Sequence, residues 1–426
     1  MMNGPIFVDR RRMLGLLVGG AAILAGCGGP GGPGGARPAR RDDEDVEFSR
    51  FAQRGYDAAV AASAYPHRET WQYGDDEIVL NLLVPHGTAP SPLVIYLPGL
   101  GENADAGDSW RQGWSRAGYA VACVQTASGA ALWSSASARN GDFNKAAREQ
   151  FSVTSLAARI RMVEFVVQGV TRRCRERESV YARIDTSRIA VAGFDLGAQT
   201  ALAFAGEIQP GGTTPTALPG LCAVLALSPH AVLAGGGFAA RFGNIKLPVL
   251  TVTGSEDRDP YGIVDPPYTR QAPFKYMPPG DKYLLVIEDG THRLLAGGGP
   301  PTGPGGDAES GRSPGRMDGE RREPPSGKGR FPGFGGGMGG PGGMGGPGGK
   351  GGPGGMGGPD GMPGGPPDEA KFRRFAEKAM QRQIVIIDRV SAAFLDATVK
   401  DDPVAREWLL RDAVRWSDPL ARLEQK

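Results

Sequence analysis

The ten residues Ile189–Ala198, IAVAGFDLGA, decide the fold of this 426-residue chain. The first four are apolar and predict a buried strand, which runs into Gly-Phe-Asp-Leu-Gly and then directly into a helical stretch. A turn this sharp holds its central residue in strained backbone geometry, so its neighbours must be very small. Gly193 and Gly197 meet that need, and they leave Asp195 exposed at the turn beside a helix N-terminus. A helix-capping Asp explains Asp195 alone, but it does not explain the two flanking glycines.

Apolar runs on both sides of this stretch alternate with helical patterns. Near-continuous apolar runs predict strands at Ile78–Val84, Leu93–Leu97, Ala120–Gln125, Ile189–Ala192, Ala223–Leu227, Val249–Thr253 and Lys282–Ile287. Apolar residues spaced by three and four predict helices at Phe151–Val170, Ala198–Ala205 and Phe372–Leu395, with a last short helix from Pro403 to Leu410. The pattern therefore predicts an α/β protein with a mostly parallel central sheet and helices on both faces.

Two further polar residues follow later predicted strands in a definite chain order. Asp257 ends Gly-Ser-Glu-Asp after the strand Val249–Thr253, and His292 ends Gly-Thr-His after the strand Lys282–Ile287. An elbow residue followed by an acid and then a histidine is the order used by α/β-hydrolases. Asp259 lies two residues beyond Asp257 and is the alternative candidate for the acid.

Another turn, Pro98-Gly99-Leu100-Gly101, follows the strand Leu93–Leu97. The backbone amides of Leu100 and Gly101, together with that of Leu196 after the elbow, are predicted to form an oxyanion hole.

These motifs together resemble an α/β-hydrolase of the predicted dienelactone hydrolase and platelet-activating-factor acetylhydrolase-like lipoproteins. The resemblance rests on the LPGLGEN turn, the elbow, the GSED loop, the GTH loop and the C-terminal helical region that contains Phe394-Leu395-Asp396. It covers about 78–295 and 371–410, and it implies an α/β-hydrolase fold and activity on esters or lactones.

Asp195 departs from this family, in which the elbow residue is a nucleophilic serine. Haloalkane dehalogenases and epoxide hydrolases carry Asp there and form an alkyl-ester intermediate, but they usually place Trp next, where this chain has Leu196. Three hypotheses follow: an ester or lactone hydrolase, with Asp195 as general base or nucleophile; a dehalogenase or epoxide hydrolase, with Asp195 as covalent nucleophile; and a non-catalytic binding protein that kept the fold.

A small-molecule substrate is expected, with no cofactor and no metal, since no Cys/His cluster has metal-ligand spacing. Five aromatic residues in predicted loops are candidates to line a pocket, although packing explains most of them equally well: Trp110, Trp114, Trp133, Tyr261 and Tyr268. Cys123, Cys174 and Cys222 are an odd number of thiols and imply no disulfide framework; Cys123 lies in an apolar run and is predicted to be buried.

The N-terminus has the pattern of an export signal. Arg10–Arg12 precede the apolar run Met13–Leu24, which is too short to span a bilayer as a mature helix. Leu24-Ala25-Gly26-Cys27 resembles a bacterial lipobox, and the paired arginines resemble a twin-arginine signal. These features predict residues 1–27 as an export signal with lipidation at Cys27, a flexible tether over 28–47, and a cell-envelope or secreted protein.

Composition separates two low-complexity segments from an ordinary domain. The chain has 68 Gly and 36 Pro, of which 32 Gly and 14 Pro lie between Gly297 and Pro367. That segment is predicted to be a disordered insert between a hydrolase domain at 48–296 and its C-terminal helices at 368–426. The rest of the domain is large enough for one hydrophobic core. A net charge of +2 with no long block of like charge disfavours nucleic acid as a partner.

Overall fold

The computed structural model describes residues 39–58, 62–87, 89–209, 217–233, 236–298 and 369–426. The chain divides into a unit Met1–Glu47 and a unit Phe48–Lys426, and the second contains the sheet. The predicted export signal, the lipidation site Cys27 and nearly all of the predicted Gly-rich insert lie outside the described residues.

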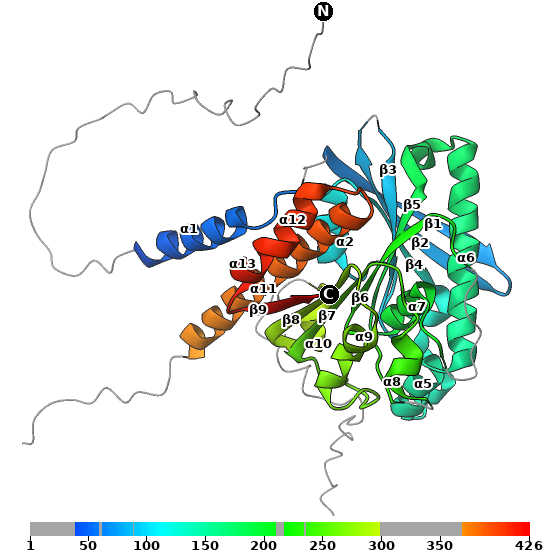
Figure 1. Cartoon of the computed structure of the whole chain (residues 1–426). Coiled ribbons are helices and arrows are strands. Elements are labelled where there is room, and N and C mark those ends of the chain that lie inside the picture. The colour runs from blue at the N-terminus through cyan, green and yellow to red at the C-terminus, as the bar shows by residue number, and fades with distance from the viewer. Residues whose placement is uncertain (1–38, 59–61, 88, 210–216, 234–235, 299–368) are drawn as a thin grey trace, which may run out of the picture. The chain divides into compact units, whose positions relative to one another are not determined.

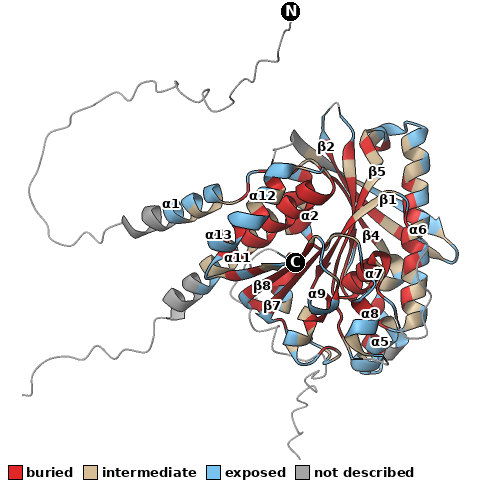
Figure 2. Ribbon diagram, in the orientation of Figure 1, coloured by how far each residue is buried: buried red, intermediate tan, exposed pale blue. Residues whose placement is uncertain are grey.

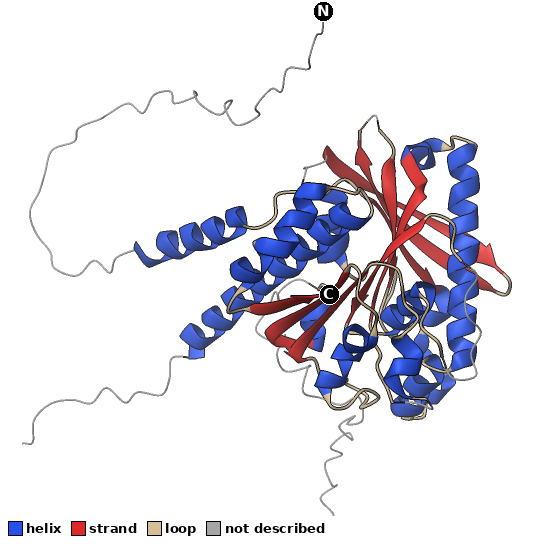
Figure 3. Cartoon of the chain, viewed as in Figure 1, coloured by secondary structure: helices blue, strands red, loops and turns tan. Residues whose placement is uncertain are grey.

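A nine-stranded mixed sheet forms the centre of the α/β fold, with the order β1-β2-β4-β3-β5-β6-β7-β8-β9 (Figures 1 and 3). The six strands from β4 to β8 in this order pair in parallel, whereas β1, β2 and β9 pair antiparallel. The strands are β1 (Ala62–Tyr73), β2 (Asp76–His86), β3 (Ser91–Leu97), β4 (Ala120–Thr126), β5 (Ile184–Phe194), β6 (Leu221–Leu227), β7 (Val249–Glu256), β8 (Lys282–Thr291) and β9 (Ala421–Gln425).

All seven predicted strands are confirmed, with longer bounds for most of them, and the mostly parallel sheet is confirmed as well. The long helices are α1 (Ala39–Arg54), α2 (Asp108–Arg116), α5 (Phe143–Gln150), α6 (Val153–Arg175), α7 (Leu196–Ala205), α11 (Glu369–Thr398) and α12 (Pro403–Arg411). The short ones are α3 (Ala127–Ala130), α4 (Ala136–Arg139), α8 (Gly237–Phe242), α9 (Ala272–Tyr276), α10 (His292–Leu295) and α13 (Ala413–Ser417), with 3₁₀ turns at Leu132–Ser134, Ser179–Arg183 and Pro267–Gln271.

Both faces of the sheet are covered, as the near-continuous apolar strands predict. In β5, Ile189 and Val191 pack into one core cluster with the buried side chains of α6 and α7. Ala190 and Ala192 pack into the other cluster, with buried side chains of α2 and α11. Successive strand residues point to opposite faces, so both faces of β5 need apolar residues. Figure 2 shows the resulting buried layers on either side of the strands.

The helices form where the apolar spacing predicts them. Leu156, Ile160, Val163 and Val167 of α6 form one buried stripe, at exposures between 0% and 5%. At the start of α12, Pro403 occupies the first turn and the Asp402 carboxylate accepts the Val404 amide at 2.8 Å.

The first helix of the structure begins within the segment predicted as a tether. The tether predicted over 28–47 includes the first half of α1, which is helical from Ala39 to Arg54. Its sequence, ARRDDEDVEFSR, contains few helix breakers and places Arg40 and Arg41 four residues before Glu44 and Asp45, a spacing that supports a helix. The composition of the preceding Gly-Pro segment does not extend into this stretch.

Candidate active site

The elbow positions Asp195 at the carboxyl end of β5, directly before α7. Its backbone has φ 48° and ψ −103°, a strained conformation for a residue with a side chain. A Cβ on Gly193 would lie 2.2 Å from the carbonyl carbon of Gly197, and a Cβ on Gly197 would lie 2.0 Å from the Leu97 oxygen. Only glycine fits both positions, so the two glycines permit the turn that holds Asp195.

Asp257 and His292 meet beside this turn although 35 residues separate them. Asp257 follows β7, His292 follows β8, and His292 Nδ1 lies 2.7 Å from Asp257 Oδ1. The carboxyl ends of parallel strands share one edge of a sheet, so residues that follow β5, β7 and β8 gather there. The structure thus brings together Asp195, Asp257 and His292, the three residues that the sequence predicts for catalysis.

The Asp257 carboxylate is fully buried and well supported. Its Oδ2 accepts the Thr253 hydroxyl at 2.8 Å, and its Oδ1 accepts the Ser228 hydroxyl at 2.8 Å. Burial alone would raise the pKa of Asp257, but the hydrogen bond to His292 and the charge of Arg270 bring that pKa below its ordinary value. Asp257 is therefore held as a carboxylate at neutral pH.

Asp259, the alternative acid, has a different role in the structure. Its two carboxylate oxygens accept the backbone amides of Tyr261 and Val264, at 2.7 and 3.0 Å. It thus orders its own loop, and it is Asp257 that contacts the histidine.

The tautomer of His292 follows from its neighbours. A carboxylate oxygen can only accept a hydrogen bond, so Nδ1 of His292 must donate to Asp257 Oδ1 and carries a proton. The Ser228 hydroxyl uses its own proton on the same oxygen, so it can only accept from Nδ1. The other ring nitrogen, Nε2, is then left to react with a substrate. Burial would lower the pKa of His292, but Asp257 and the negative charge of Asp195 raise it above its ordinary value. The Asp257 and Asp195 side chains therefore favour the protonated form of His292 over the neutral form, relative to a free histidine.

The sequence predicts that Asp195 is exposed at the turn, but it is buried, at 6% exposure, because the residues around the elbow pack against it. Burial raises the pKa of its carboxyl. His292 and Arg270 lower it in part, as does the backbone amide of Leu100, which hydrogen-bonds to the carboxyl group. A carboxylate with a raised pKa is a stronger base than a solvated one.

The amides predicted for the oxyanion hole belong to the turn after β3 and to the start of α7. The Leu100 amide hydrogen-bonds to the Asp195 carboxyl, Gly101 has φ +69°, and Leu196 is the first residue of α7. Amides in the first turn of a helix have no acceptor inside it. The Gly99 amide is not available, because it donates to the Glu102 carboxylate at 2.7 Å, and burial raises the pKa of that glutamate to about 7.

Aromatic and apolar side chains pack around the elbow. Leu100 and Leu196 share a small cluster with Trp133, Tyr261 and Ile263. The rings of Trp133 and Tyr261 stack at 5.1 Å, and burial together with the charge of Asp195 raises the pKa of Tyr261 to about 12. Of the aromatic residues predicted to line a pocket, these two lie near Asp195.

The other three candidate aromatics lie outside the cluster around the elbow. Trp110 and Trp114 are fully buried in the main core, and Tyr268 is 65% exposed.

Several site residues escape prediction from sequence. Ser228 comes directly after β6 and has φ 51°, and its hydroxyl links Asp257 to His292. Arg270 is fully buried and donates to the carbonyls of Asp257, Ser228 and Pro229. The position of Ser228 at the end of a predicted strand was a usable signal, whereas nothing local marks Arg270.

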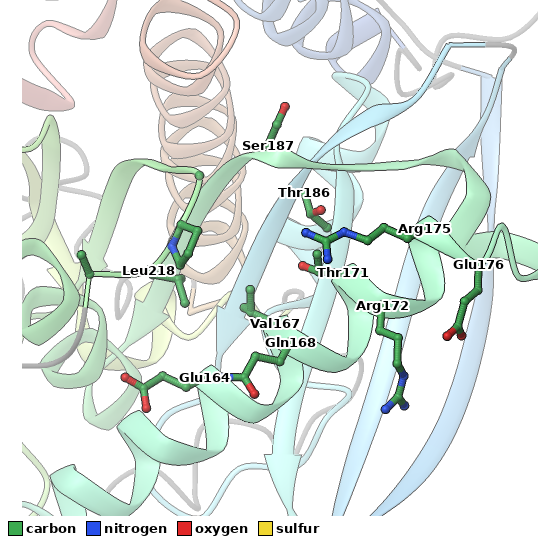
Figure 4. A pocket seen from close by; sticks show the side chains of 13 residues that line it. Glu164, Val167, Gln168, Thr171, Arg172, Arg175, Glu176, Thr186, Ser187 and Leu218 are labelled. Carbon is green, nitrogen blue, oxygen red and sulfur yellow. The ribbon is translucent and has the colours of Figure 1, made fainter.

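A surface hollow of about 920 Å³ lies near the amino ends of β5 and β6, whereas Asp195 follows the carboxyl end of β5 (Figure 4). The last turns of α6, including Thr171 and Arg175, line it together with Thr186 near the start of β5 and Leu218 before β6. Ligands of open α/β sheets bind at the carboxyl ends of the strands, so this hollow is not the catalytic site.

No group of three or more His, Cys, Asp or Glu suited to a metal ion occurs among the described residues. Over the same part of the chain, Cys123, Cys174 and Cys222 are free thiols, and Cys123 is fully buried, as predicted. None of the helices that the structure describes is long and apolar enough to cross a membrane.

No protein-family model and no curated protein matches the chain.

Proposed function

We propose that this chain is an α/β-hydrolase-fold enzyme that hydrolyses carboxylic esters or lactones, with Asp195, His292 and Asp257 as its catalytic residues. The observation that carries the proposal is the meeting of a strained elbow carboxylate with a His–Asp pair at the carboxyl edge of a mostly parallel sheet. The elbow, acid and histidine also follow each other in the chain order of that fold.

The charges at the site support general-base chemistry on an ester. Asp195, with its raised pKa, takes a proton from water as the water attacks the substrate carbonyl. The amides of Gly101 and Leu196 stabilise the oxyanion that forms, and the Leu100 amide joins them once protonation of Asp195 weakens its hydrogen bond to that carboxyl. His292, with its raised pKa, then donates the Nε2 proton to the departing alkoxide, while Asp257 holds Nδ1.

A second candidate is covalent hydrolysis of an alkyl halide or epoxide. It is favoured by the carboxylate itself, because attack on an sp3 carbon gives a stable alkyl ester, whereas attack on a carboxylic ester gives a high-energy mixed anhydride. The apolar cluster of Leu100, Leu196 and Trp133 suits an apolar alkyl group. In this reaction neutral His292 activates the water that hydrolyses the intermediate.

A substrate panel separates these candidates. We expect the purified chain to hydrolyse p-nitrophenyl butyrate or a γ- or δ-lactone, and Asp195→Asn to lower kcat by about 10²- to 10⁴-fold without unfolding the protein. Turnover of only 1-bromobutane or styrene oxide would contradict ester hydrolysis and favour the second candidate, covalent hydrolysis of an alkyl halide or epoxide. Inactivity on the whole panel, or full activity in Asp195→Ala, would overturn it in favour of a binding protein or of chemistry elsewhere.

A further inference from the structure

His230 is a buried histidine that the proposed mechanism does not use. It follows Ser228 and Pro229 after β6, it is 6% exposed, and the ring of Phe151 stacks on it at 4.5 Å. Neither of its ring nitrogens has a hydrogen-bond partner among the residues that the structure describes. Buried polar groups in folded proteins are nearly always paired, so an unpartnered imidazole calls for a physical reason.

The unpartnered ring stacks on Phe151, which packs in the same apolar cluster as Leu100 and Leu196 of the candidate active site. The amide of Asp195 donates to the Leu227 carbonyl at 2.9 Å, which places the end of β6 beside the elbow. Arg270 Nη1 donates to the carbonyls of Ser228 and Pro229 at 3.0 and 3.2 Å, immediately before His230. His230 therefore lies only a few residues after Leu227, the residue of β6 that hydrogen-bonds to the elbow.

Arg270 presents a second unused donor. Within the described ranges its Nη2 has no hydrogen-bond partner, and the carboxylate of Asp259 lies 4.0 Å away. The side chain is fully buried and acts on Asp195 and on His230 through its charge. Two buried polar groups next to the candidate catalytic residues thus have hydrogen-bonding capacity that no described protein atom uses.

His230 remains neutral under physiological conditions. Burial, together with the charges of Arg241, Arg270 and Arg159, lowers its pKa to about 3. A neutral imidazole offers one N–H donor and one acceptor nitrogen. A carboxylate ligand would satisfy only the donor, whereas a hydroxyl group both donates and accepts.

We propose that His230 and Arg270 Nη2 form a binding site for a hydroxyl group on the acyl chain of the substrate. The inference rests on the proposed function for the identity of the acyl chain, and it makes hydroxy-acid esters or the corresponding lactones the preferred substrate class. The apolar cluster around Trp133 and Tyr261 then packs against the carbon chain. A ligand group that pairs with both buried side chains gains more binding free energy than one that leaves them unpaired.

Binding is tested without turnover on the full chain with 15N-labelled histidine. The probes are 2-hydroxybutyrate, 3-hydroxybutyrate, butyrate and succinate, and the readout is the ring resonances of the four histidines, assigned with single His→Gln variants. We expect one hydroxybutyrate to shift the His230 signals and to bind at least about tenfold more tightly than butyrate. His67, paired with Glu69, is the internal control and should not move. Equal binding of butyrate, or preference for succinate, would overturn the hydroxyl assignment.

A substitution separates a binding role from a structural one. His230→Leu removes an unpartnered polar group from the core, so we expect Tm to rise by about 2–4 °C while the preference for hydroxybutyrate falls to within about twofold. His230→Gln keeps a donor and an acceptor and should retain part of the preference. A lower Tm in His230→Leu with an unchanged preference would show that His230 is structural.

The two proposals fail in distinguishable ways. Hydroxybutyrate binding at His230 without hydrolysis of any ester would leave the binding site standing and remove the proposed activity. Hydrolysis of ethyl butyrate and ethyl 3-hydroxybutyrate with equal kcat/KM, and equal values for the 2-hydroxy ester, would leave the activity and remove the binding site.

Discussion

Asp195 is an acidic residue in a buried turn, and under the proposed function its carboxyl can act on substrate in two different ways. As a general base it moves a proton and keeps both of its oxygens. As a nucleophile it forms an ester, and one of its oxygens leaves with the product when water hydrolyses that ester. The raised pKa of Asp195 favours the base, and the stability of alkyl esters favours the nucleophile on an sp3 carbon.

A single turnover in ¹⁸O-water distinguishes the two. With an ester or lactone substrate we expect the label in the released acid and an unlabelled Asp195 peptide, as measured by mass spectrometry after digestion. With an alkyl substrate we expect the reverse, and His292→Gln should then accumulate a covalent adduct at Asp195. Label in the Asp195 peptide during ester hydrolysis would contradict the general-base mechanism.

His292 gives the activity a pH dependence whose sign follows from its environment. Asp257 and Asp195 raise its pKa, so the protonated ring persists to higher pH than in a free histidine, whose pKa is about 6.5. In general-base hydrolysis the imidazolium is the active form, and kcat should fall with rising pH along a limb centred above about 6.5.

Asp257→Asn removes one of the two charges that stabilise this imidazolium. We expect it to move the limb to lower pH and to reduce kcat, as measured by pH–rate profiles of both proteins on one ester. A limb that rises with pH instead would show that neutral His292 acts as a base. An unmoved limb in Asp257→Asn would exclude His292 as its origin. Asp259→Asn is the matched control, and its limb should stay close to that of the parent protein.

Sequence predicts the ends of strands better than the contacts made there. Asp195, Asp257 and His292 each follow an apolar run, so their position at one edge of the sheet could be inferred from the chain alone. Ser228, Arg270 and His230 lie at the same edge, yet their roles depend on long-range contacts that no local pattern encodes. Asp257 and Asp259 likewise differ only in their contacts, because both are aspartates in the same loop after β7.

At the scale of elements, the elbow requires close approach of three backbone segments. Gly197 at the start of α7 lies against the carbonyl of Leu97 at the end of β3, and Gly193 lies against Gly197. Because backbone atoms cannot move aside as a flexible side chain can, an added methyl group must displace α7 or the end of β3, which leads into the turn Pro98–Gly101.

Gly197→Ala should therefore destabilise the protein by about 1–3 kcal/mol or more and lower activity beyond that loss, since it shifts Asp195 and Leu100 relative to each other. Urea unfolding and ester hydrolysis measure the two effects. Gly87→Ala is the matched control: Gly87 is exposed after β2, and no described atom lies within 4 Å of its added Cβ. It should be neutral or slightly stabilising. Equal stability of the two variants would contradict the packing argument.

The two strands that the sequence did not predict, β1 and β9, share a physical cause. In β1, residues such as His67, Arg68 and Glu69 interrupt any apolar run, because this edge strand pairs with β2 alone. In β9, only Ala421 and Leu423 are buried, and the strand is held by pairing with β8. Edge strands can carry polar residues on much of their surface, so hydrophobic pattern detects central strands and misses these.

At the scale of the whole molecule, the chain combines a packed core with long segments of a different composition. Roughly 310 residues remain after the N-terminal segment and the Gly-rich insert are set aside, near the upper limit for one hydrophobic core. The insert predicted over 297–367 enters between α10, which begins at His292, and α11. Long insertions at a surface add little closure entropy, about 0.6 kcal/mol for each doubling of length, so the fold tolerates one at this point.

The N-terminal sequence makes the broadest prediction, that the enzyme acts at a membrane surface through a lipid on Cys27. Paired arginines, a short apolar run and Leu-Ala-Gly-Cys carry it, and all of them lie outside the described residues. We expect the full chain, produced in a bacterium with lipoprotein processing, to incorporate an alkyne fatty-acid probe and to sediment with membranes. Cys27→Ala should abolish the labelling and release the protein into the soluble fraction, while ester hydrolysis by the released protein keeps its kcat. A single acyl chain binds membranes only marginally, so retention after one high-salt wash should depend on the number of acyl groups that the cysteine carries.

Cys174→Ala is the matched control and should be labelled as strongly as the parent protein, since the Cys174 thiol lies within the folded unit and should not take up the probe. Equal labelling of the parent protein and Cys27→Ala would remove the anchor, and it would leave the catalytic proposal untouched because the sheet edge that carries Asp195 lies entirely within Phe48–Lys426.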